Sequence, residues 1–186
     1  MKVITRIEKV YYYYPNLVTV VGVNCGEKEN FMSAVWNTGL SFDPPLFGVA
    51  IAPSRYSHSF IQKTGEFSCN FLPFEELDMV HFCGRTSGKD VDKVRVKNLP
   101  VFYGVKTRAP LLSNAYCAME CKLVHTFPTG DHNFFVGEIL AIHYREDAYD
   151  AQVRLMLGKI RPVFYLGKDT YCTADPASIS EKPRKI

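Results

Sequence analysis

The stretch from Asn30 to Asn70 constrains the fold most, because two adjacent prolines lie at its centre. Pro44 and Pro45 each fix φ near about −65°, lack an N–H donor and disfavour the helical region for the residue before them. We therefore expect Asp43 and Pro44 to be extended, and no helix to run through the motif S-F-D-P-P. The run from Leu46 to Ala52 is short, apolar and partly β-branched, which indicates a strand buried on both faces.

A candidate anion site follows that strand directly. A short helix is expected from about His58 to Thr64, with Ser57 as its N-cap and Gly65 at its end. The N-terminus of a helix has free N–H groups and a partial positive charge, to which Arg55 adds a forked donor and Ser57 and Ser59 add hydroxyls. This combination suits a phosphate group. An ordinary capped helix with a solvated arginine would show the same residues.

Short strands joined by tight turns dominate the rest of the chain. A helical stretch is expected from Pro73 to Cys83, and the charged segment from Gly84 to Pro100 is expected to be a surface or functional loop. The pattern predicts a mostly β protein, a small antiparallel barrel with a few short helices. We expect a single domain over residues 1–186, with residues 1–14 and 174–186 at its periphery. The other expected strands are Leu17 to Val23, Phe31 to Trp36, Glu66 to Leu72, Val101 to Val105, Tyr116 to Thr126, Phe134 to Tyr144 and Val163 to Leu166.

Charge and motif content exclude several classes of function. The net charge is only +3 and the 22 basic residues are scattered, so we expect an anionic small ligand and no nucleic acid. Neither G-x-G-x-x-G nor G-x-x-x-x-G-K-S/T occurs, which excludes the usual Rossmann and P-loop fingerprints. The five histidines are far apart and no G-x-S-x-G is present, so neither a metal site nor a serine hydrolase is expected.

The cysteines and the N-terminus indicate a soluble protein of a reducing compartment, the cytoplasm. The six cysteines include no C-x-x-C motif, and Cys117 and Cys121 alternate with Met119 on one face of a predicted strand, as small buried hydrophobic residues do. Charged residues in the first nine positions leave no apolar core of signal-peptide length, and the run from Leu17 to Val23 is too short to span a membrane.

The aromatic run from Tyr11 to Tyr14 allows several interpretations. It suits an extended segment, a dimer contact or an aromatic rim to a pocket. The sequence does not decide among them.

Several motifs in a fixed order resemble those of the flavin reductase-like family of FMN-binding split barrels, and within it most closely the flavoredoxins. They are N-x-M-S-x-x-W from Asn30, S-x-D-P-P from Ser41, P-S-R-Y-S from Pro53, T-G-E-F-x-x-N from Thr64, F-C-G-R-T-S-G-K-D-V-D-K from Phe82 and G-D-H-N-F-F-V-G-E-I from Gly130. The resemblance covers about Val18 to Tyr165. It implies a Greek-key-like split β-barrel and FMN as the cofactor.

The resemblance also implies which residues hold the polar part of FMN. Ser57 matches a position where the family bonds the phosphate through a hydroxyl, and Arg55 fits the same anion on physical grounds. Asn30 would contact the polar edge or the ribityl chain of the flavin, although alone it is an ordinary turn residue. Lys93 matches a flavin-site lysine, whereas the plainer interpretation is a solvated lysine in a charged loop.

A second group would lie against the flavin ring. Trp36, the only tryptophan, would stack near the isoalloxazine, although a tryptophan at a strand end is ordinarily a core or rim residue. His132 is the one candidate for a catalytic contact near the ring, and a hairpin-turn histidine is the alternative. Tyr165 is favoured over Phe164 as an aromatic neighbour of the flavin, because adjacent strand residues point to opposite faces.

The implied function is an FMN-dependent oxidoreductase that passes electrons from NAD(P)H, or from a redox protein, to ferric iron, free flavin or a redox partner. The alternative is a flavoredoxin-type electron carrier with little NAD(P)H oxidation of its own. A third interpretation is an interaction module that has lost its flavin. The resemblance further implies a homodimer with the flavin near the subunit interface.

Overall fold

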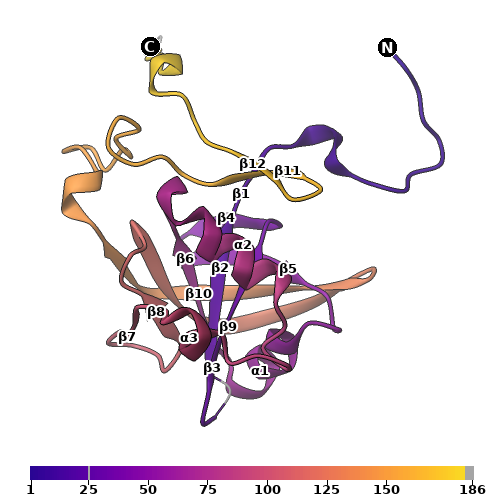
Figure 1. Cartoon of the computed structure of the whole chain (residues 1–186), viewed down its shortest axis with the longest axis vertical. Helices are drawn as coiled ribbons and strands as arrows, with labels where there is room; N and C mark the ends of the chain where they lie inside the picture. Colours follow the sequence, from indigo (N-terminus) through magenta and orange to yellow (C-terminus); the bar gives the residue numbers. More distant parts are fainter. Residues whose placement is uncertain (25, 183–186) are drawn as a thin grey trace.

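The computed structural model describes residues 1–24 and 26–182, and an antiparallel sheet forms its centre. The sheet has the strand order β3-β2-β6-β9-β10-β5-β4, and a smaller sheet, β1-β11-β12, lies at one end of the molecule (Figure 1). The predicted mostly β architecture with a few short helices is confirmed. The strands are β1 Asn16–Leu17, β2 Thr19–Asn24, β3 Glu29–Ala34, β4 Asn37–Phe42, β5 Pro45–Ile51, β6 Glu66–Phe71, β7 Val101–Tyr103, β8 Pro110–Leu112, β9 Cys117–Thr129, β10 His132–Tyr144, β11 Phe164–Gly167 and β12 Thr170–Cys172.

The helices are short and lie around one edge strand of the central sheet. They are α1 Tyr56–Thr64, α2 Leu77–Arg85 and α3 Lys93–Lys97, with single 3₁₀ turns at Tyr11–Tyr13, Phe74–Glu76, Glu146–Ala148 and Pro176–Ser178. All three α-helices contact β3, which is an edge strand of the central sheet. None of the helices in the described residues is long and apolar enough to cross a membrane.

The double proline lies in a β-hairpin. Asp43 and Pro44 form the turn between β4 and β5, and the expected exclusion of a helix is confirmed. That both residues are extended stays a prediction. Strand β4 was not predicted, because as an edge strand it is mostly exposed and lacks a buried apolar pattern. Phe47 to Val49 in β5 are buried in succession, as expected for a strand covered on both faces.

The two longest strands, β9 and β10, form a hairpin whose turn contains Gly130 at φ 74°, as predicted. The expected alternation along β9 is not seen in its burial, since Val124 and His125 in the second half are both exposed. In the first half of the strand, Ala118 and Glu120 are buried, although they point to the face opposite Met119 and Cys121. Glu120 is covered by the 104–107 segment.

The segment from Gly84 to Pro100 is not wholly a loop. It contains the single-turn helix α3, whose N-cap Asp92 accepts a hydrogen bond from the Arg95 N–H at 3.1 Å. The predicted Pro73 to Cys83 helix is a 3₁₀ turn followed by α2. The short strands β8 and β12 were not predicted, because three residues carry too little periodicity to detect.

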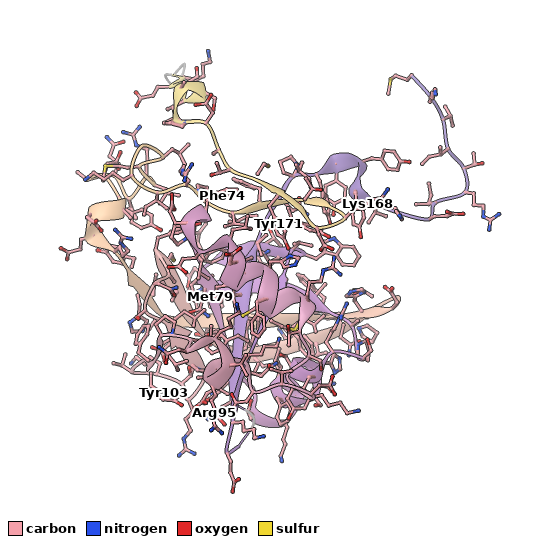
Figure 2. All side chains as sticks on the ribbon, viewed as in Figure 1. Phe74, Met79, Arg95, Tyr103, Lys168 and Tyr171 are labelled. Carbon is pink, nitrogen blue, oxygen red and sulfur yellow. The ribbon has the colours of Figure 1, made fainter. Side chains whose placement is uncertain are left out.

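Two apolar cores position these elements. One lies inside the curved central sheet around Phe67 and Phe135, and the other lies between the sheet and α2, around Phe31 and Val80. Figure 2 shows Met79 on α2 and Tyr171 on β12 lying close to this second core.

The cysteines largely follow the prediction of buried thiols. Cys69, Cys83 and Cys121 are buried, Cys117 and Cys172 are half-buried, and all five are free. Cys25 and residues 183–186 of the predicted tail lie outside the described residues.

One buried carboxylate ties β9 to the segment before β8. Glu120 accepts hydrogen bonds from the N–H groups of Val105, Lys106 and Thr107 at 2.6–2.9 Å and is 2.8 Å from Nε2 of His143. Burial by itself would raise the pKa of Glu120, but these hydrogen bonds outweigh it and lower the pKa to about 2.

The Glu120→Gln substitution will therefore destabilise the protein in a pH-dependent way. A carboxyl pKa lowered from 4.5 to about 2 stabilises the fold by about 3 kcal/mol above the unfolded-state pKa. That contribution is lost as the pH falls through the folded-state pKa. We expect urea denaturation to show a deficit of roughly 3 kcal/mol near neutral pH that shrinks as the pH falls below about 4.

The exposed Glu146 provides the control for this measurement. Glu146→Gln should leave the free energy of unfolding within about 0.5 kcal/mol of the parent at each pH, as for most surface substitutions. A Glu120→Gln deficit that stays constant between neutral and acid pH would contradict this account.

Candidate functional site

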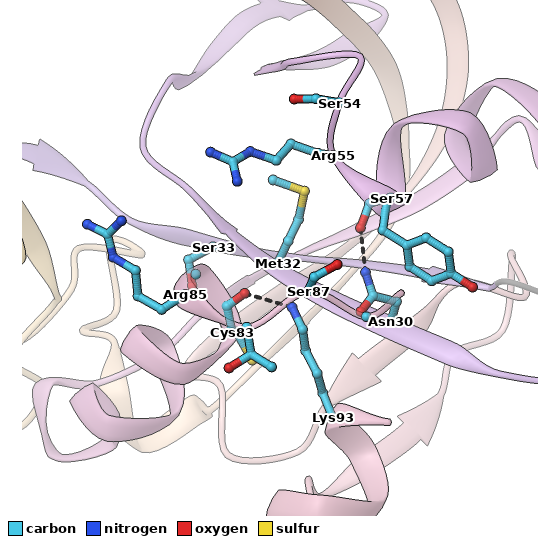
Figure 3. Close-up of a pocket in the computed structure, with 14 residues that line it drawn as sticks. Asn30, Met32, Ser33, Ser54, Arg55, Ser57, Cys83, Arg85, Ser87 and Lys93 are labelled. Carbon is cyan, nitrogen blue, oxygen red and sulfur yellow. Dashed lines mark hydrogen bonds between the residues drawn. The ribbon is translucent and has the colours of Figure 1, made fainter. Parts of the chain in front are cut away.

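A cavity of about 380 Å³ opens where β3, the turn before α1 and the end of α2 meet. Figure 3 shows side chains from all three elements pointing toward it, with Lys93 at its base. The residues that line the cavity are Asn30, Met32, Ser33, Ser54, Arg55, Tyr56, Ser57, Cys83, Gly84, Arg85, Thr86, Ser87, Gly88 and Lys93.

The cavity lining favours an anion. It includes three basic side chains, Arg55, Arg85 and Lys93, together with five hydroxyl side chains from Ser and Thr residues, and none of the described residues that line it is acidic. Guanidinium groups and hydroxyls are the usual protein donors to phosphate oxygens. The cavity can therefore bind a phosphate-sized anion with several hydrogen bonds.

Asn30 and Ser57 form a buried polar pair in the wall. The Asn30 side-chain Nδ2 donates a hydrogen bond to Ser57 Oγ at 2.8 Å, and both residues are buried. The amide oxygen of Asn30 is buried without a hydrogen-bond partner, which is a costly state for a carbonyl oxygen. A Cβ at position 88 would collide with this oxygen, so Gly88 is the residue that allows the 84–88 segment to approach it. This oxygen is therefore a buried acceptor that the 84–88 segment covers.

The prediction that Ser57 caps α1 is wrong. The helix begins at Tyr56, its N-cap is Arg55 with extended backbone and no side-chain capping bond, and Ser57 lies in the first turn with its hydroxyl bonded to Asn30. The helix ends at Gly65 in the left-handed region, φ 67°, as predicted. Ser59 is exposed and does not line the cavity.

Lys93 is a buried residue and not a solvated loop lysine. Its side chain is 2% exposed, and Nζ donates to the backbone oxygens of Phe31 at 2.6 Å and Cys83 at 2.8 Å. Burial lowers the pKa of Lys93, and the nearby charge of Arg55 acts in the same direction. An ammonium group has three donors, so one N–H remains for a group in the cavity.

Trp36 and His132 meet at the end of β5. Their ring centroids are 4.7 Å apart, and the Trp36 Nε1–H donates to the Tyr14 hydroxyl at 2.8 Å. Neither residue lines the cavity. The Ala50 N–H donates to the Trp36 carbonyl at 2.8 Å, and the chain runs on from β5 into Ser54 and Arg55 of the cavity wall. The structure thus brings together Trp36 and His132, the pair predicted for the flavin ring, outside the cavity that the predicted phosphate-side residues line.

Tyr165 lies in an aromatic cluster outside the cavity lining. Its ring centroid is 5.1 Å from that of Tyr171, 6.1 Å from Tyr14 and 6.4 Å from Tyr11. Because Tyr14 also accepts the hydrogen bond from Trp36, this cluster continues to the Trp36 side of the site. The run Tyr11 to Tyr14 therefore folds partly onto the protein. Phe164 pairs with Leu17 and is half-buried.

The residues that sequence reasoning missed come mainly from one segment. Arg85, Thr86, Ser87 and Gly88 line the cavity, as does Ser54. The signal was present in G-R-T-S-G, which combines a cation, two hydroxyls and flanking glycines. The many charges that follow made the segment resemble an ordinary surface loop.

Comparison with known proteins assigns the family. The flavin reductase like domain matches residues 11–173 of this chain. The chain belongs to the flavin reductase-like family.

Two solved structures share the fold along nearly the whole chain, and a curated relative is similar in sequence. An FMN-binding protein from Thermus thermophilus, solved with bound 1-cyclohex-2-enone, is 38% identical with a TM-score of 0.87, and the match covers 97% of this chain and 98% of that one. Flavoredoxin from Methanosarcina acetivorans is 32% identical with a TM-score of 0.84, covering 94% and 92%. An NADH-dependent flavin reductase from a Rhodococcus species is 28% identical over 88% of this chain and 89% of its own.

Two serines on α1 provide a matched test of the cavity wall. Ser57→Ala removes the acceptor for Asn30 Nδ2 in a buried site, so the free energy of unfolding should fall by about 1–3 kcal/mol. Ser59→Ala changes the same atoms at an exposed helical position and should be neutral or stabilising by up to about 0.5 kcal/mol. Chemical denaturation of both variants measures the difference, and equal effects would show that the buried pair contributes nothing.

Proposed function

We propose that this protein is an FMN-binding oxidoreductase, which passes electrons from NAD(P)H or a protein donor through bound FMN to an acceptor such as ferric iron, free flavin or a redox partner. The observation that carries the proposal is the cavity at β3, α1 and α2, because it combines three cations with an unpaired buried acceptor in a chain of the flavin reductase-like family.

The residues present fit the polar half of FMN. A phosphate monoester carries nearly two negative charges at neutral pH, and Arg55, Arg85 and Lys93 supply the compensating charge. Ser57 and the hydroxyls of the 84–88 segment offer further donors. The ribityl chain carries hydroxyl groups, and one of them would satisfy the unpaired oxygen of Asn30.

The aromatic residues fit the flavin ring. Trp36 and His132 offer flat faces at the end of β5, and Tyr14 fixes the Trp36 indole through its hydroxyl. His132 can place a nicotinamide or hold charge on the reduced ring, and Tyr165 supports the aromatic wall through Tyr14. Bound FMN supplies hydride and single-electron transfer, while these residues orient it and limit water access.

The relatives support the cofactor and the reaction class. The Thermus protein is named for FMN binding, and the Rhodococcus protein for NADH-dependent flavin reduction. We further propose a homodimer, with a second copy near the flavin.

An electron carrier is the second candidate. Flavoredoxin from Methanosarcina is 32% identical to this chain and covers nearly all of it. A carrier would use the same cavity and the same cofactor, but it would exchange electrons with protein partners and oxidise little NAD(P)H.

Substituting Arg55 tests the phosphate assignment. Arg55→Met should raise the Kd for FMN about tenfold to a hundredfold, because a charge-assisted hydrogen bond contributes about 1.5–3 kcal/mol. The Kd for riboflavin, which lacks the phosphate, should stay within about twofold. Quenching of the single tryptophan on titration provides the measurement.

Lys63→Met is the control, because Lys63 is an exposed cation in the last turn of the same helix and does not line the cavity. It should leave both affinities unchanged. Equal losses of FMN and riboflavin affinity in Arg55→Met would refute a phosphate contact.

The reductase and the carrier differ in one spectroscopic measurement. The purified protein with FMN is mixed anaerobically with NADPH and then with NADH. Bleaching of the flavin band within seconds identifies a reductase and its donor. A band that persists with both nucleotides and bleaches with dithionite identifies the carrier.

A further inference from the structure

Arg85 connects the cavity to the C-terminal hairpin. It is the last residue of α2 and lines the cavity, and its Nε and Nη2 both donate to Oδ1 of Asp169. Asp169 lies in the turn between β11 and β12, some eighty residues later in the chain. A residue remote in sequence thus holds one of the three cations of the cavity.

The turn that carries Asp169 has an unusual composition. Lys168 and Asp169 have φ values of 50° and 59°, as in the type I′ turns that favour Asn and Gly. Aspartate is one of the few residues besides Gly and Asn that tolerate left-handed backbone, whereas lysine is not. The turn therefore permits Asp169, and its carboxylate is used by the contact with Arg85.

One further contact braces the hairpin internally, and another joins it to α2. The Asp169 N–H donates to the Tyr165 hydroxyl at 3.2 Å, and the Tyr171 hydroxyl is 3.2 Å from Nδ1 of His81. His81 and Arg85 are four residues apart, so they lie on the same face of α2. Figure 2 shows Lys168 at the tip of this hairpin and Tyr171 beside α2. The carboxylate of Asp169 is therefore held in place and does not sit on a free loop.

The contact leaves Arg85 able to bind a ligand. A guanidinium group has five N–H donors, and the contact with Asp169 uses two of them, one on Nε and one on Nη2. The remaining three donors are free to bond an anion in the cavity that Arg85 lines. The hydrogen bond to Asp169 also raises the pKa of Arg85, so the guanidinium stays charged.

We propose that Arg85 binds the phosphate of FMN and that Asp169 is the positioning residue that orients it. This inference rests on the proposed function, since it names a further contact in the same cavity. Without the carboxylate, Arg85 is a long side chain on the surface, and binding must restrict its rotamers. With the Asp169 carboxylate present, the rotamers of Arg85 are already restricted in the free protein.

The Asp169→Asn substitution tests the positioning role. Asn is favoured in left-handed turns, so the hairpin keeps its conformation while the charge that holds Arg85 is lost. The Kd for FMN should rise about threefold to tenfold, which corresponds to the cost of immobilising one flexible side chain. The Kd for riboflavin should not change, because the effect acts through the phosphate. Lys168→Asn is the matched control in the same turn and should change neither Kd.

A double-mutant cycle shows whether Asp169 affects FMN binding only through Arg85. Arg85→Ala should raise the FMN Kd by tenfold or more, and adding Asp169→Asn to Arg85→Ala should then have no further effect. Additive effects, or equal losses of FMN and riboflavin affinity in Asp169→Asn, would overturn the inference. If the parent binds FMN and depends on Arg55 while Asp169→Asn is silent, the inference fails and the proposed function stands. If the parent binds no FMN, the proposed function itself fails.

Discussion

The buried ammonium group of Lys93 is the contact on which the site depends. β3 is an edge strand, and an edge strand leaves backbone carbonyls without strand partners. Lys93 donates to one of them, that of Phe31, and at the same time to the carbonyl of Cys83 in α2. A single side chain thus satisfies the edge of the sheet and attaches the helix to it. The cavity is the space that remains above this attachment.

The charges around that space are arranged asymmetrically. The lining residues include three cations. One of them, Arg85, pairs with the carboxylate of Asp169. Asp169 belongs to the C-terminal hairpin and is not part of the lining. The buried carboxylate of Glu120 is bonded by backbone N–H groups and His143 in a different part of the sheet. Positive potential is therefore concentrated in one concave place, although the protein as a whole has a net charge of only +3.

The sequence predicts the parts of this arrangement that depend on local chemistry. The double proline excludes a helix, Gly65 ends α1 and Gly130 turns the β9–β10 hairpin, and each of these follows from a backbone preference. Four of the eight predicted site residues, Asn30, Arg55, Ser57 and Lys93, line one cavity. Their roles toward a flavin stay predictions.

The missed features depend on contacts between distant segments. The hydroxyl of Ser57 bonds Asn30 and not its own helix, because the packing of β3 against α1 brings a buried amide to it. Lys93 is buried because α3 folds under α2, which no charge pattern indicates. Arg85 and Asp169 are 84 residues apart, so their pairing follows only from the position of the β11–β12 hairpin against α2.

The isolation of the single indole has a practical consequence. Trp36 is the only tryptophan, it lies where β5 leads into the cavity wall, and its N–H is held by Tyr14 while His132 covers one face. Its emission therefore reports on one defined location, without background from other indoles. The protein has an intrinsic optical probe at the boundary between its cationic cavity and its aromatic cluster.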